Sequence, residues 1–94
     1  MSTSNLFLIQ SAYHATTAVI EKLRQLYSAN DAIVLMGDAV LLANDDFFKS
    51  LAVIYVLDNE SANLPDAQQT NIKVISYAEF ADLTLSFARS ISLK

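Results

Sequence analysis

Side chains that could do chemistry come directly after four short apolar segments of this sequence. In chain order they are Gln10, Ser11, Tyr13 and His14; Gly37 and Asp38; Asp58, Asn59 and Glu60; and Ser76 and Tyr77. In open α/β sheets, ligands bind beyond the carboxyl ends of the strands. If the four apolar segments are parallel strands, these side chains are therefore expected to gather at one edge of a sheet.

The residue types at these positions favour binding over catalysis. The sequence contains no cysteine, which excludes a thiolate nucleophile, a redox dithiol and a thiolate metal site. His14 is the only histidine, and Ser11 lies in neither a nucleophile elbow nor a Ser-His-Asp spacing. We predict that the chain is not an enzyme, that Ser11 caps a helix, and that His14 is a surface or interface residue.

The acidic residues and the single glycine do not predict a cofactor. Asp58 follows the third apolar segment, as the phosphoacceptor of a receiver domain does, but Gln10 and Ser11 replace the acidic pair which that domain needs. Magnesium requires converging carboxylates, and one glycine cannot form a phosphate-binding loop. We expect no metal and no cofactor, and we expect Gly37 to adopt an unusual backbone conformation while Asp38 caps the following helix.

The elements that position these side chains alternate between strand and helix. Apolar runs predict strands over residues 6–10, 32–36, 52–57 and 72–75, and the tail from 90 to 94 is either a short edge strand or a frayed end. Apolar residues at helical spacing predict helices over residues 19–27 and 80–87, and shorter helical turns over 39–43 and 44–51. Ser76 and Glu79 match a capping box at the start of the last helix. This alternation predicts an α/β fold with a mainly parallel sheet of four to five strands and helices on both faces.

Composition limits the partners and the compartment. Of the 94 residues, which we expect to form one domain over 1–94, 53% are hydrophobic and 17% are charged. So small a domain with so much apolar surface is expected to pack against another subunit, although parallel strands covered on both faces also raise the apolar content. The net charge of −4 and the scattered basic residues argue against direct nucleic-acid binding. No apolar run is long enough to cross a membrane, and no signal peptide is recognisable, so we expect a cytoplasmic protein.

Four segments together resemble the DsrH/TusB family of small sulfur-relay subunits. They are residues 31–42 (DAIVLMGDAVLL), 53–58 (VIYVLD), 75–84 (ISYAEFADLT) and 8–14 (LIQSAYH). The resemblance implies a three-layer α/β/α fold of the DsrE type. It also implies a heterohexamer that contains two copies each of this chain, a TusC/DsrF-like subunit and a TusD/DsrE-like subunit.

Such complexes pass persulfide sulfur between carrier proteins, either for 2-thiolation of the tRNA wobble uridine or, in sulfur oxidisers, for dissimilatory sulfur metabolism. The family's sulfur-carrying cysteine is mainly on a partner subunit. This chain has no cysteine and also lacks the tryptophan often found near the family's C-terminus. It is therefore similar to the TusB type, a non-catalytic structural subunit of a TusBCD/DsrEFH-like complex.

Two other functions remain open at this point. In the sulfur-relay interpretation, aromatic anchors for an interface are Tyr13, Phe47, Phe48 and Tyr77, any of which could instead be core. A stand-alone domain that binds a small ligand would use a pocket near His14, Asp38 and Asp58. A homo-oligomer of the same fold, without a role in the relay, is the third possibility.

Overall fold

A parallel sheet forms the centre of the structure, a computed structural model that describes residues 4–10, 15–28, 30–64 and 69–93. Within these residues the sheet has five strands, β1 (Asn5–Ile9), β2 (Ala32–Leu35), β3 (Ile54–Leu57), β4 (Ile72–Ile75) and β5 (Arg89–Leu93). Their order across the sheet is β4-β3-β2-β1-β5, and each neighbouring pair is parallel. The central strand β2 is buried along its whole length, as expected of a strand covered on both faces.

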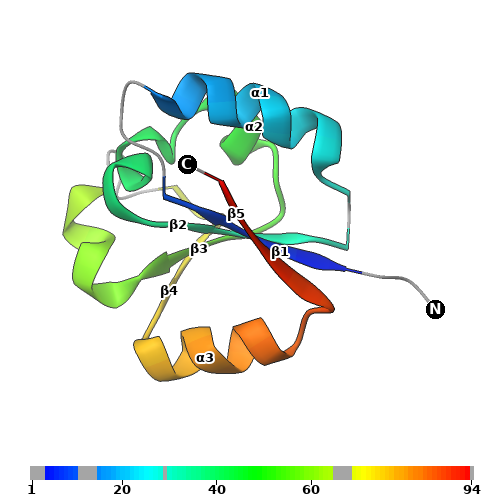
Figure 1. Cartoon of the computed structure of the whole chain (residues 1–94). Helices are drawn as coiled ribbons and strands as arrows, with labels where there is room; N and C mark the ends of the chain where they lie inside the picture. The colour runs from blue at the N-terminus through cyan, green and yellow to red at the C-terminus, as the bar shows by residue number, and fades with distance from the viewer. Residues whose placement is uncertain (1–3, 11–14, 29, 65–68, 94) are drawn as a thin grey trace.

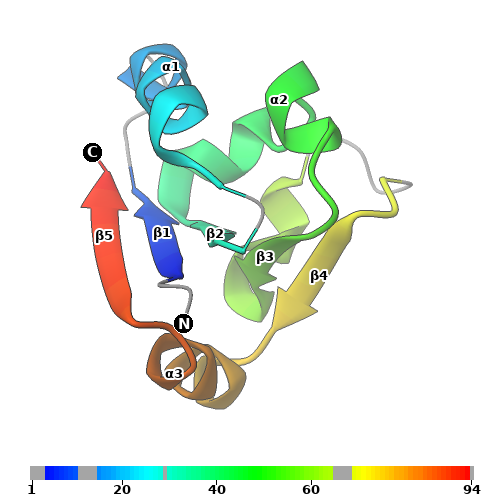
Figure 2. The same ribbon diagram turned by 90° about the vertical axis from the view of Figure 1, so that its right-hand side faces the viewer.

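Helices cover the two faces of the sheet unequally. The helical segments are α1 (Thr16–Leu26), the 3-10 helix η2 (Gly37–Leu42), α2 (Asp46–Lys49), the 3-10 helix η3 (Asp58–Asn63) and α3 (Tyr77–Leu85). In Figures 1 and 2, α1 and α2 lie on one side of the sheet and α3 lies alone on the other. This arrangement confirms the predicted three-layer α/β/α fold.

Strand order determines which face each helix covers. The chain runs from β1 to β4 by stepping in one direction across the sheet, then returns to place β5 beside β1. Because crossovers between parallel strands are right-handed, reversing the direction moves the connecting helix to the opposite face. The return step therefore puts α3 on the face that α1 leaves open.

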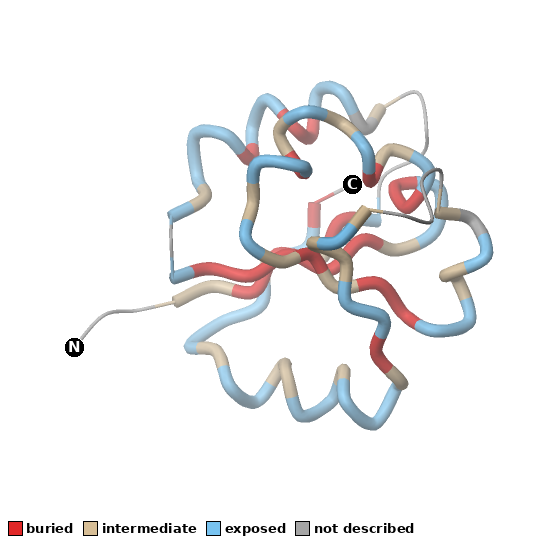
Figure 3. Tube along the Cα trace, turned by 180° about the vertical axis from the view of Figure 1, so that it is seen from behind, coloured by how far each residue is buried: buried red, intermediate tan, exposed pale blue. Residues whose placement is uncertain are grey.

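The hydrophobic core is correspondingly thicker on the α1 side. Among the described residues, fourteen buried side chains form the cluster that includes α1, whereas Leu6, Ala32 and Val34 form the cluster beneath α3. None of the residues of α3 is buried, and Figure 3 shows this helix without a buried position. Helix α3 thus packs on the sheet through half-buried side chains only.

Most local predictions agree with the structure. The strand predicted over 72–75 has those bounds, the others differ by one or two residues, and the tail forms β5 rather than a frayed end. The Ser76–Glu79 capping box is present, with the Glu79 amide donating to the Ser76 hydroxyl at 3.1 Å and the Ser76 amide donating to the Glu79 carboxylate at 2.9 Å.

The expected cap at Asp38 is wrong. The helix after β2 is a 3-10 helix that no neighbouring side chain caps, and Asp38 is exposed in its first turn. The first amide of this 3-10 helix, that of Gly37, instead donates to the carboxylate of Glu60 in η3. A side chain from a distant segment therefore satisfies the amide that a local cap would normally bind.

A buried carboxylate joins the start of β1 to the turn before β2. Asp31 is only 7% exposed, and it accepts hydrogen bonds from the Asn5 amide at 2.8 Å, the Ser28 amide at 3.0 Å and the Ser28 hydroxyl at 3.2 Å. Burial of Tyr27 and, secondarily, the negative charge of Asp31 raise the pKa of the Tyr27 hydroxyl. The carboxylate thereby fixes the end of α1 against the edge where β1 and β2 begin.

Replacing Asp31 tests how much this connection stabilises the fold. The substitution Asp31→Ala leaves the two amides without their acceptor, so we expect it to lower the free energy of unfolding by about 2 kcal/mol. Asp58→Ala, at an exposed carboxylate, is the control and should change it by less than about 0.5 kcal/mol. Urea denaturation followed by circular dichroism measures both, and equal effects of the two variants would contradict the assignment.

Candidate functional site

A hollow of about 320 Å³ lies where the strands end, at the edge predicted to bind ligands. Its position follows from the topology, because each contributing segment lies at or just beyond the carboxyl end of a strand. We call it the carboxyl-edge hollow, and its lining residues are Gln10, Met36, Gly37, Leu57, Asn59, Glu60 and Tyr77.

Backbone conformation and one long-range hydrogen bond shape the carboxyl-edge hollow. Gly37 has a φ of 59°, in the left-handed region that glycine adopts without steric cost. The chain there turns from β2 into η2, which lies against η3. The Gly37 amide donates to the Glu60 carboxylate, and the Gln10 side-chain amide donates to the Met36 sulfur at 3.4 Å. These contacts hold the ends of β1, β2 and β3 together.

The lining of the carboxyl-edge hollow suits hydrogen bonding rather than covalent chemistry. Gln10 and Asn59 supply side-chain amides, Glu60 a carboxylate and Tyr77 a phenol. None of the seven lining residues offers a thiol or an imidazole, the groups that most often act as nucleophile or general base near neutral pH. The hollow can therefore bind a small polar molecule or a side chain of another protein.

The structure brings together only some of the residues singled out from the sequence. Gly37, Asn59, Glu60, Gln10 and Tyr77 share the carboxyl-edge hollow. Asp38 and Asp58 are exposed next to it in the chain and do not line it. Tyr13 and His14 lie outside the described residues, as does Ser11.

The two neighbouring phenylalanines have different environments. Phe48 is fully buried in the main core, which is the alternative that the sequence left open for it. Phe47 is half-buried, with its ring edge-on to Tyr27 at a centroid distance of 6.2 Å. The Arg24 guanidinium lies 5.2 Å from the Phe47 ring, a cation–π distance. Phe47 thus joins α2 to α1 and is already largely covered.

Sequence reasoning did not find Met36 and Leu57 in the hollow. Both are the last apolar residues of predicted strands, so their apolar side chains were interpreted as part of the hydrophobic core. Their positions at the strand ends, directly before Gly37 and Asp58, were the available signal.

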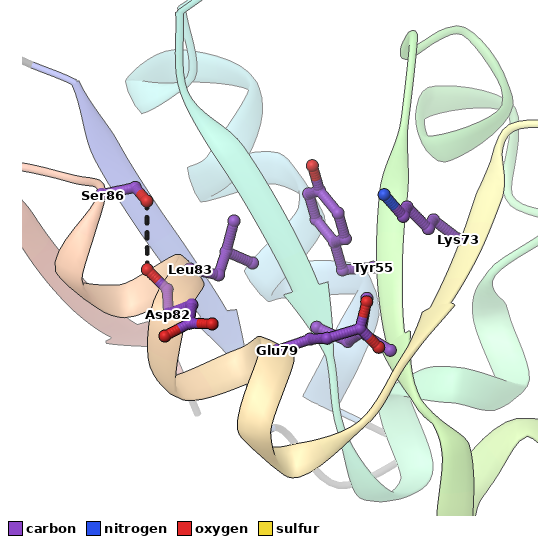
Figure 4. A pocket seen from close by; sticks show the side chains of 7 residues that line it. Tyr55, Lys73, Glu79, Asp82, Leu83 and Ser86 are labelled. Atoms are coloured by element: carbon purple, nitrogen blue, oxygen red, sulfur yellow. Dashed lines mark hydrogen bonds between the residues drawn. The ribbon is translucent and has the colours of Figure 1, made fainter.

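A second hollow, of about 300 Å³, opens between α3 and the β3–β4 side of the sheet. Figure 4 shows Tyr55 and Lys73 on the strands, opposite Glu79, Asp82 and Leu83 on α3 and Ser86 just after its end. The Ser86 hydroxyl is used within the helix, donating to the Asp82 carbonyl at 3.0 Å. Hydrogen bonds between Glu79 and the backbone and side chain of Ser76 lower the pKa of the Glu79 carboxyl. The positive charge of Lys73 lowers this pKa to a lesser extent. This hollow was not predicted, because it depends on how α3 leans on the sheet.

No three His, Asp or Glu side chains in the described ranges come together as a metal site would require. None of the described helices is long and apolar enough to cross a membrane.

The left-handed backbone at Gly37 gives a direct test of how the hollow is built. A Cβ at this position would meet no atom within 4 Å, so Gly37→Ala introduces backbone strain alone and should cost about 1 kcal/mol of stability. Gly37→Asn should cost less, because asparagine tolerates this conformation. Thermal denaturation of both variants measures the difference, and a cost for asparagine as large as that for alanine would rule out the backbone explanation.

The comparison with protein families identifies the chain. Residues 10–90 match the family described as DsrH like protein, a segment that runs from the residue after β1 into β5. No curated protein matches the chain. The family match confirms the resemblance found in the sequence. Because it spans most of the 94 residues, the chain belongs to the DsrH-like family, whose members are subunits of sulfur-relay complexes.

Proposed function

We propose that this chain is the non-catalytic, structural subunit of a TusBCD/DsrEFH-like sulfur-relay complex. The observation that carries the proposal is a sequence without cysteine in a family of sulfur-relay subunits. A persulfide needs a cysteine sulfur, and the thiolate is the group that attacks and transfers. This chain therefore supports sulfur transfer by assembling with a partner that carries the reactive cysteine.

The proposed partners are two homologous small subunits, one TusC/DsrF-like and one TusD/DsrE-like, in a heterohexamer with two copies of each chain. Exposed large apolar side chains support an assembly, notably Tyr77 and Leu85 on α3, which are 59% and 84% exposed. Apolar surface of this kind marks protein interfaces. Sulfur-carrier proteins would meet the complex at the partner's cysteine, in the cytoplasm.

The proposed role of the complex is 2-thiolation of the tRNA wobble uridine. Dissimilatory sulfur oxidation is the alternative within the family, and the lack of a cysteine favours the TusB-like, tRNA-modifying type. The chain's own part is indirect, because a net charge of −4 disfavours contact with a phosphate backbone.

The carboxyl-edge hollow supports a second candidate, a domain that binds a small polar ligand on its own. Its position beyond the strand ends is the usual place for such a site. A metabolite that raises the melting temperature of the isolated wild-type chain, but not that of a Glu60→Ala variant, would favour this function.

Removing the chain from cells that produce it tests the proposed function. We expect the 2-thiouridine content of wobble-position nucleosides to fall at least about tenfold, because the partner's cysteine loses its supporting subunit. Mass spectrometry of digested tRNA measures this content. The wild-type chain supplied from a plasmid should restore it, and a chain that cannot assemble should not. Unchanged thiouridine in the deleted cells would contradict a role in tRNA thiolation.

A further inference from the structure

Helix α3 is apolar on two opposite sides. Phe80 and Leu83, followed by Phe87, pack towards the sheet. Ala78, Ala81 and Leu85 recur at spacings of three and four residues on the opposite side, and all three are exposed. Residues with this spacing share one face of a helix. We call this face the outer stripe of α3.

The outer stripe is exposed to solvent in the described part of the chain. Leu85 is 84% exposed, and the helices α1 and α2 lie on the other side of the sheet (Figures 1 and 2). An apolar stripe on a surface helix normally faces a packing partner. The intact capping box at Ser76 defines where α3 begins, so the stripe stands on a regular helix rather than a fraying end.

The charged side chains on α3 itself are both negative. Asp82 lies between Ala78 and Leu85 on the exposed face, and Glu79 borders it on the side of the second hollow. Residues 77–85 include no lysine or arginine. Lys73 stands on β4, across the hollow from Asp82 (Figure 4). The stripe is thus an apolar surface with carboxylates along the border that faces the second hollow.

These charges disfavour a second copy as the occupant of the stripe. In a symmetric antiparallel pair of α3 helices centred between Ala81 and Asp82, Leu85 would lie level with Ala78 of the other copy. The same symmetry would bring Asp82 of one copy close to Asp82 of the other, because an isologous interface uses the same surface on both copies. Two like charges taken out of water repel strongly, and both copies carry a net charge of −4.

We propose that the outer stripe of α3 docks a helix of a different subunit whose apolar residues are flanked by lysine or arginine. Leu85 is the apolar anchor of this contact, and the small side chains Ala78 and Ala81 let the two helices approach closely. Asp82 pairs with a basic side chain of the partner. The proposal rests on the proposed function, since the partner helix belongs to one of the two homologous subunits of the relay complex.

The test is a binding titration of purified chain variants onto the purified pair of homologous subunits. Leu85→Glu should weaken binding at least about thirtyfold, because it puts a charge at the apolar anchor. Asp82→Lys should weaken it at least about tenfold by reversing the complementary charge. Two matched controls should bind like the wild type: Leu26→Glu, on α1 at 50% exposure, and Asp58→Lys, at the carboxyl edge. Melting curves establish that each variant is folded.

Each outcome decides between the alternatives. Loss of binding for the two α3 variants alone supports the docking surface. If they bind as tightly as their controls while the wild type assembles, the docking surface is wrong and the proposed function stands. If the wild type binds neither subunit, both fall. A wild-type chain that dimerises alone, and becomes monomeric on Leu85→Glu, would show that a second copy occupies the stripe and would overturn the choice of partner.

Discussion

The right-handedness of crossovers between parallel strands is the constraint on which the rest of this structure depends. The chain places β1 to β4 in sequence across the sheet, and then sets β5 beside β1. That return sends α3 across the face opposite α1 and α2. One nine-residue helix covers a five-stranded face only partly. The thin core beneath α3 and the hollow beside it both follow from this single crossover.

The same topology divides the molecule's surfaces by function. All strands end at one edge, where Gly37 and Glu60 hold η2 against η3 and form the carboxyl-edge hollow. At the opposite end, Asp31 joins the start of β1 to the turn that precedes β2. The end fixed by Asp31 is structural, and the carboxyl edge presents polar groups. The α3 face presents apolar ones, including the exposed Leu85, which suit the contact with another subunit that we propose.

Local patterns predicted the elements whose cause is local. Continuous apolar runs identified β2 and β3, and Ser76 with Glu79 identified the start of α3. The tail was ambiguous because Ser90 and Ser92 alternate with apolar residues. Its strand conformation comes from pairing with β1, where Leu6 and Leu8 are their partners. Asp38 was misassigned because the acceptor for the Gly37 amide comes from Glu60, twenty-three residues along the chain. Short-range patterns carry no information about such a contact. They also carry none about how α3 packs on the sheet, which determines the hollow beside Lys73.

Native mass spectrometry of this chain, co-expressed with the two homologous small subunits, tests the central claim most directly. A cysteine-free structural subunit should appear in a three-component complex with two copies of each chain, and the reactive persulfide should be found on a partner's cysteine. A chain that remains separate from both subunits at concentrations where those subunits assemble with each other would contradict the account. It would then direct attention to the carboxyl-edge hollow as a site that acts on its own.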